Sequence, residues 1–180
     1  GDKRLRAVLI GPGLGRDDAA RAQLAAGSRA KALVLDADAL HLVTSDTVRK
    51  GVPAIATPHD GELEALCRTF SVIAEGRMAK ARALARASGM VVLAKGPDSF
   101  VASPEGALAI GPAASSWLSV AGSGDVLAGV VVSRLATGED PFDAACQALW
   151  LHGEAARLCD AAFTPEDLAE RVGDALAACL

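Results

Sequence analysis

Aromatic side chains are scarce in this chain of 180 residues, where they make up 3% of the sequence and tyrosine is absent. Alanine, valine and leucine therefore have to supply the apolar surface of the core, and hydrophobic residues reach 51% of the total. Charged residues account for only 22%. These proportions exclude an intrinsically disordered chain and are typical of a globular domain of ordinary size.

Long apolar runs and basic clusters are also missing. The longest apolar run, residues 126–132, contains Gly129 and is much shorter than the stretch of about 18 residues that spans a bilayer. The net charge is -4, and no signal peptide is apparent. We therefore expect a cytoplasmic protein that binds neither nucleic acid nor a membrane. The four cysteines form no C-x-x-C pair, which argues against a zinc site or a disulfide framework.

Short apolar runs alternate with helical patterns along the chain. The runs are apolar throughout rather than alternating with polar residues, which is typical of a parallel sheet covered on both faces. The last two flank a Ser-Pro-Glu-Gly turn and predict a β-hairpin. The sequence therefore predicts an α/β fold with a mostly parallel sheet, helices on both faces and a late hairpin, in one domain over residues 1–180. The predicted strands cover residues 5–10, 32–35, 54–56, 91–94, 100–102 and 107–110.

The predicted helices carry recognisable end signals. Asp17 and Asp140 are suitable N-caps, and Gly89 is a suitable C-cap. Thr164 and Asp167 have the spacing of a capping box. The predicted helices cover residues 17–26, 61–70, 74–88, 123–136 and 141–159, with a last helix that opens at residue 164.

A glycine-rich turn follows the first predicted strand at residues 11–15, at the sheet edge where α/β proteins bind ligands. It imitates a dinucleotide-binding fingerprint. The frame that starts at Gly11, however, places Arg16 where the third glycine should stand. We therefore expect a tight turn here rather than the site of a nicotinamide dehydrogenase.

The strongest local signal is Gly-Ser-Gly-Asp at residues 122–125, at the start of a predicted helix. Small residues there let backbone amides face a ligand, and the positive end of the helix dipole favours an anion such as a phosphoryl group. Asp125 could then hydrogen-bond a substrate hydroxyl and accept its proton. Ordinary helix capping is the alternative interpretation.

Three other side chains are candidates for binding or capping. Lys95 follows the fourth strand, where it could contact a phosphate or be a solvated cation. His59 follows the third strand, and we favour a ligand contact there, whereas His152, inside a helix, is interpreted as structural. Glu62 could cap the next helix or reach Mg²⁺ through water, and we prefer capping.

Five motifs occur in this order and at fitting spacing: GPGLGRD at residues 11–17, LDADAL at 35–40, TPHDGELEAL at 57–66, AKG at 94–96 and AGSGDVLAG at 121–129. Together they resemble the ADP- or ATP-dependent NAD(P)H-hydrate dehydratase family, a carbohydrate-kinase-like domain with a ribokinase-type fold. The resemblance extends from Arg6 to about the last helix. It implies a three-layer, ribokinase-like architecture.

The resemblance also implies a repair lyase. Such an enzyme converts (6S)-hydrated NADH or NADPH (NADHX or NADPHX) back to NADH or NADPH and consumes ADP or ATP. Phosphorylation of the 6-hydroxyl would turn a poor leaving group into phosphate, which the ring nitrogen could expel. By the same resemblance we expect Mg²⁺ as cofactor, a homo-oligomer, and an epimerase domain on the same full-length polypeptide.

The family motifs imply a role for each matching residue. Asp125 would meet the substrate hydroxyl, and Gly13 or Gly15 together with His59 would contact substrate. Glu62 would help to place Mg²⁺ through water, and Asp36 and Asp38 would support the pocket. The implied anion hole is Gly122, Ser123 and Gly124. The implied nucleotide-binding residues are Lys95, Gly96, Pro97, Asp98, Ser99 and Gly124.

The sequence departs from the family pattern in three places. Asp60 stands where proline is common after the histidine, and residues 112–118 replace an Asn-Pro-Gly-like stretch. The family domain also normally starts about a hundred residues earlier, so we expect this chain to be roughly two thirds of a domain. Two alternatives remain: a ribokinase-fold kinase that acts on a vitamin precursor or sugar, and an inactive fragment that only binds nucleotide.

Overall fold

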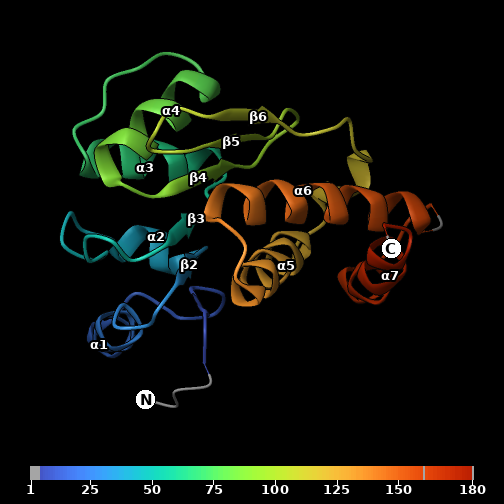
Figure 1. Ribbon diagram of the computed structural model, residues 1–180, viewed down its shortest axis with the longest axis horizontal. Coiled ribbons are helices and arrows are strands. Elements are labelled where there is room, and N and C mark those ends of the chain that lie inside the picture. Colours follow the sequence, from blue (N-terminus) through green and yellow to red (C-terminus); the bar gives the residue numbers. More distant parts are fainter. Residues whose placement is uncertain (1–4, 160, 180) are drawn as a thin grey trace.

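A six-stranded sheet forms the centre of the computed structural model, which describes residues 5–159 and 161–179 (Figure 1). The strands are β1 (Val8–Ile10), β2 (Leu33–Leu35), β3 (Ala54–Ala56), β4 (Val91–Ala94), β5 (Phe100–Ala102) and β6 (Leu108–Ile110). Their order in the sheet is the order of the chain. The first four are parallel, and β5 and β6 each run antiparallel to the preceding strand.

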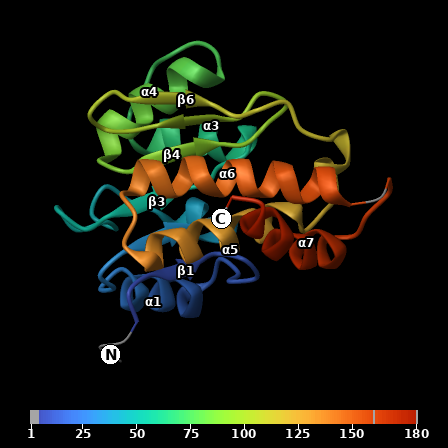
Figure 2. The ribbon, with the colours of Figure 1, turned by 45° about the vertical axis from the view of Figure 1, so that its right-hand side comes forward.

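Helices cover both faces of the sheet. One face carries α1 (Asp18–Gly27), α2 (Asp38–Leu42), α3 (Asp60–Thr69) and α4 (Arg77–Ser88), and the other carries α5 (Ser123–Thr137), α6 (Pro141–Leu158) and α7 (Pro165–Ala177). Figures 1 and 2 show these two groups on opposite sides of the strands. A 3₁₀ helix, η1 (Ser116–Ser119), precedes α5. Within the described ranges, no helix is long and apolar enough to cross a membrane.

The two layers of helices explain the uninterrupted apolar strands. Leu33 and Leu35 of β2 enter the core under α1–α4, whereas Val34 enters the core under α5–α7. All three side chains are fully buried. Because successive side chains of a strand point to opposite faces, a strand covered on both sides needs an apolar residue at every position.

The predicted α/β fold, with its mostly parallel sheet and late hairpin, is confirmed. The predicted caps also form: the side chains of Asp17 and Asp140 accept amide hydrogen bonds, and Thr164 opens a capping box. Two boundaries were wrong, because β1 begins only at Val8 and α4 begins after Gly76. The sequence predicts neither α2 nor η1, which are both shorter than two turns of α-helix.

The loop after β1 passes very close to the end of β2. Gly11 has φ +139°, and a β-carbon there would lie 1.6 Å from the carbonyl oxygen of Asp36. Next to that carbonyl, Ala37 has φ 47° and ψ -126°, a conformation that residues with a side chain rarely adopt. The two loops are therefore fixed against each other at the carboxyl edge of the sheet.

We predict that Gly11→Ala lowers the free energy of unfolding by about 3 kcal/mol or more, because the new methyl group overlaps the Asp36 carbonyl. Gly129→Ala is the matched control. Gly129 lies in α5 with open space at its β-carbon position, so this change should be neutral or stabilise by up to about 1 kcal/mol. Urea unfolding measures both variants, and equal stabilities would contradict the close approach.

Candidate functional site

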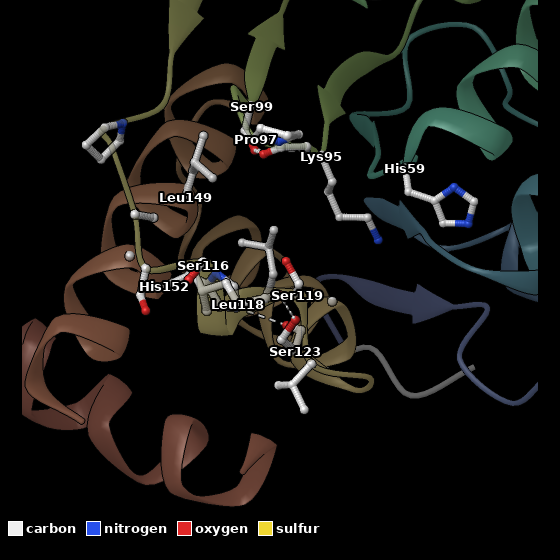
Figure 3. Close-up of a pocket in the computed structure, with 18 residues that line it drawn as sticks. His59, Lys95, Pro97, Ser99, Ser116, Leu118, Ser119, Ser123, Leu149 and His152 are labelled. Carbon is white, nitrogen blue, oxygen red and sulfur yellow. Dashed lines mark hydrogen bonds between the residues drawn. The ribbon is translucent and has the colours of Figure 1, made fainter. Parts of the chain in front are cut away.

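A cavity of about 630 Å³ opens beyond the end of β4 (Figure 3). Its walls are the loop after β4, η1 and parts of α5 and α6. Pro97, Leu118 and Leu149 contribute apolar surface, whereas Lys95 and Gly124 contribute polar groups. Figure 3 shows the Lys95 side chain extending from the end of its strand into this space. The cavity therefore lies where an open α/β sheet usually binds its ligand.

A buried carboxylate holds Lys95 in place. Lys95 Nζ donates to Asp36 Oδ1 at 2.7 Å, and the same oxygen accepts a hydrogen bond from Thr57 Oγ1 at 2.7 Å. Asp36 is 1% exposed, and the Lys95 side chain is 19% exposed. A buried charge without a partner is strongly destabilising, so the pair fixes the position of both groups.

The ammonium group of Lys95 lies against the start of α5. A β-carbon at Gly124 would be 3.2 Å from Nζ, so a larger residue there would press on the lysine. The dipole of α5 places partial positive charge at the same point. The Lys95 ammonium and the start of α5 thus lie together beside the cavity, where both could interact with a bound anion.

The first-turn amides of α5 differ in their hydrogen bonds. The amide of Ser123 donates to the Val120 carbonyl at 3.2 Å, and that of Asp125 donates to the Gly122 carbonyl at 3.1 Å. Within residues 5–159 and 161–179, no group accepts a hydrogen bond from the Gly124 amide. Because Gly124 lines the cavity, this unpaired amide can serve as a donor to an anion.

His59 lines the cavity and also caps α3. Its Nδ1 accepts hydrogen bonds from the amides of Gly61, at 3.0 Å, and Glu62, at 3.3 Å. In return, Glu62 Oε2 accepts the His59 amide at 2.8 Å, and Oε1 lies 3.3 Å from Nε2. Since Nδ1 accepts, the proton of the neutral ring is assigned to Nε2. The preferred capping role of Glu62 is therefore confirmed.

Asp60, which replaces the expected proline, helps to anchor the loop after β4. Arg77 donates to both carboxylate oxygens of Asp60 at 2.6 Å and to the Asp98 carbonyl at 3.1 Å. These hydrogen bonds hold the pKa of Asp60 below its usual value. A β-carbon at Gly96 would lie only 2.3 Å from Arg77 Cζ, so the loop packs directly on the guanidinium.

The structure gathers part of the predicted site around the cavity. Its lining includes His59, Lys95, Gly96, Pro97, Ser99, Ser123 and Gly124. The predicted residues that lie outside this lining are Gly13, Gly15, Glu62, Asp98, Gly122 and Asp125. Asp125 is exposed and directly follows Gly124. A substrate hydroxyl would therefore have to approach Asp125 from outside the lined volume.

Asp36 and Thr57 contribute more to the site than the sequence predicts. The sequence predicts only a supporting role for Asp36 and none for Thr57. The available signal is a polar residue directly after a fully apolar strand, where burial requires a partner. That partner, Lys95, is 59 positions from Asp36, and only the adjacency of β2, β3 and β4 brings the two together.

His152 on α6 forms part of the cavity wall and reaches the start of α5. It is 5% exposed, and its Nε2 lies 2.9 Å from the Ser123 carbonyl oxygen. A carbonyl can only accept, so Nε2 carries the proton and donates. Burial is the main reason that the pKa of His152 falls from 6.5 to about 4. The imidazole is therefore neutral near pH 7.

The sheet order and the helix start beside the cavity define a ribokinase-like fold. Within this class, the chain belongs to the NAD(P)H-hydrate dehydratase family, whose model matches residues 1–177. An ADP-dependent (S)-NAD(P)H-hydrate dehydratase from Neisseria meningitidis is 37% identical over 161 residues, which cover 84% of this chain and 54% of the relative. A bifunctional NAD(P)H-hydrate repair enzyme, Nnr, from Gloeobacter violaceus is 39% identical over 157 residues, which cover 85% of this chain and 30% of the relative.

A solved structure has a similar fold. The ADP/ATP-dependent NAD(P)H-hydrate dehydratase from Bacillus subtilis, co-crystallized with ATP/Mg²⁺, matches with a TM-score of 0.82 and 27% identity. The match covers 96% of this chain and 64% of that one. This chain thus spans less than two thirds of the length of each of these three relatives.

Protonation of His152 should make the stability depend on pH. The unfolded chain binds this proton below about pH 6.5, whereas the folded protein binds it only near pH 4, so stability falls as the pH drops between these values. From pH 7 to pH 5, this group should lower the free energy of unfolding by about 2 kcal/mol. His152→Gln should remove that part of the loss. Urea unfolding at both pH values measures it, and an unchanged pH dependence in the variant would refute the buried neutral imidazole.

Proposed function

We propose that this chain carries a nucleotide-dependent dehydratase site that acts on hydrated NADH and NADPH, with ADP or ATP as phosphoryl donor. The observation that carries the proposal is the convergence of the Lys95 ammonium and the unpaired Gly124 amide beside a cavity with an apolar wall. The names of the Neisseria and Bacillus relatives support it.

The proposed nucleotide would place its base against the apolar wall and its phosphates at the start of α5. Pro97, Leu118 and Leu149 offer the surface for the base, and Lys95 and Gly124 offer the donors for the phosphates. The cavity volume of about 630 Å³ is within the range of about 300–1,000 Å³ that is typical of small-molecule sites. Arg77 keeps the loop between them in place.

The proposed chemistry begins with transfer of a phosphoryl group to the 6-hydroxyl of the substrate. Asp125 would accept the hydroxyl proton while the oxygen attacks phosphorus, and the bond from phosphorus to the departing nucleotide would break. Lys95 and the Gly124 amide would stabilise the negative charge on the phosphoryl oxygens. The lone pair of the ring nitrogen would then expel phosphate from C6, and loss of a proton from C5 would restore the dihydronicotinamide.

Mg²⁺ suits this site through the nucleotide rather than through a protein cage. No group of three or more His, Cys, Asp or Glu side chains that could hold a metal occurs among the residues that the structure describes. The carboxylate of Glu62 already bonds His59, so we propose that Glu62 contacts Mg²⁺ only through water. Mg²⁺ commonly keeps several waters and binds phosphate oxygens, where it neutralises charge during transfer. The homo-oligomer, the epimerase domain and the cytoplasmic location stay predictions.

Removal of the charge at Lys95 should weaken nucleotide binding. We predict that Lys95→Gln lowers ADP affinity about tenfold, because its amide can still bond Asp36 but no longer offers a cation to phosphate. Lys80→Gln is the matched control, since Lys80 pairs with Glu64 on the surface of α3 and α4. Calorimetric titration with ADP measures both, and equal affinities for the two variants would contradict the phosphate contact.

The activity itself can be tested with hydrated NADH, Mg²⁺ and either ADP or ATP. We expect dihydronicotinamide absorbance to return together with release of phosphate. Asp125→Asn should slow this reaction at least about a hundredfold, because it removes the proton acceptor. Asp17→Asn, which keeps the cap of α1, is the control.

Two other results would replace the proposal. A stable phosphorylated product without phosphate release would identify a small-molecule kinase of the same fold. Nucleotide binding without any turnover would identify an inactive fragment. Full activity of Asp125→Asn would exclude the proposed role of that carboxylate but would not contradict the dehydratase activity.

A further inference from the structure

The peptide group that joins Ser123 to Gly124, at the start of α5, is held at its carbonyl and open at its amide. Its carbonyl oxygen, on Ser123, accepts a hydrogen bond from His152 Nε2 at 2.9 Å. Its amide, on Gly124, has no acceptor within the described part of the chain, and Gly124 is one of the residues that line the cavity. A trans peptide group is planar and its C=O and N–H point in opposite directions, so a bond that fixes the carbonyl also fixes the direction of the amide.

The hydrogen bond from His152 is not needed to complete the helix. Only the last four carbonyls of an α-helix lack partners inside it, and Ser123 lies in the first turn of α5. A leucine at position 152 would fill a buried site without burying a polar ring. The structure nevertheless places a buried imidazole with a donor aimed at this carbonyl, next to the predicted anion site.

We propose that His152 is a positioning residue: its Nε2–H holds the Ser123 carbonyl and thereby orients and polarises the Gly124 amide for a phosphoryl oxygen. Hydrogen bonds in a chain strengthen one another, so a donor on the carbonyl makes the amide of the same peptide group a better donor. His152 itself does not touch the reacting atoms. The inference rests on the proposed function, because it requires an anion at the start of α5.

Three substitutions of His152 separate the hydrogen bond from simple packing. In His152→Gln the amide nitrogen is four bonds from Cα, as Nε2 is, so it can still reach the carbonyl. In His152→Asn the side chain is polar but one bond shorter, and in His152→Leu the volume is kept without a donor. We expect Gln to bind ADP nearly as tightly as wild type, and Asn and Leu to bind about three- to tenfold more weakly.

NMR of the Gly124 amide reports its polarisation when the variants are compared with one another, since Gln, Asn and Leu all lack the imidazole ring. In the Asn and Leu variants its proton resonance should lie upfield of that in Gln, because the amide is less polarised. Thermal unfolding at about pH 7 identifies any variant that does not fold. Equal ADP affinities and equal Gly124 shifts in folded Gln, Asn and Leu variants would overturn the proposal.

Measurements on the wild type keep the test decisive if Asn and Leu do not fold. Labelled histidine should show the proton of His152 on Nε2, and ADP should shift the Gly124 amide. The opposite tautomer, or a Gly124 amide resonance that bound ADP does not shift, would overturn the positioning role without contradicting the proposed function. A wild-type chain that does not bind ADP would overturn both.

Discussion

The buried carboxylate of Asp36 is the constraint on which the carboxyl edge of the sheet depends. Asp36 directly follows β2, and its carboxylate accepts hydrogen bonds from Thr57 and Lys95. Its backbone carbonyl leaves no room for a side chain at Gly11. A buried anion needs these partners, because its loss of hydration is otherwise uncompensated. The segments that follow the first four strands are thereby held at one point.

The same ion pair explains why positive charge collects at the start of α5. Lys95 satisfies Asp36, yet its ammonium also lies beside Gly124, where the helix dipole is positive. Asp36 balances the charge of Lys95 in the absence of a ligand. In the proposed function, the same ammonium and the helix start would together receive a phosphoryl group.

The binding and the chemistry that we propose would occupy neighbouring but separate surfaces of this edge. Lys95 and Gly124 face the cavity, whereas Asp125, one residue further along the helix, is exposed outside its lining. Successive residues of a helix point in different directions, so one short motif can serve a nucleotide on one side and a second substrate on the other. In the proposed function, the glycine–serine–glycine sequence would bind the nucleotide and the carboxylate would meet the second substrate.

Local patterns were sufficient for most elements of the fold. Uninterrupted apolar runs predicted the strands because both faces are covered, and the cap residues Asp17, Asp140 and Thr164 lie within three positions of their partners. The short helix α2 was missed because it begins after the strained Ala37 without any side-chain cap bond, so no local signal marks its start.

The sequence by itself determined the α/β class, the helix start at residues 122–125 and the capping box of Glu62, because each depends on residues only a few positions apart. Only the tertiary structure decided that Asp36 would hold Lys95, 59 positions away, and that His152 would reach Ser123, 29 positions away. Those contacts depend on the order of the parallel strands and on how α5 packs against α6. Contacts between residues so far apart produce no periodic pattern in the sequence. The buried polar groups reach their partners only when the sheet has formed.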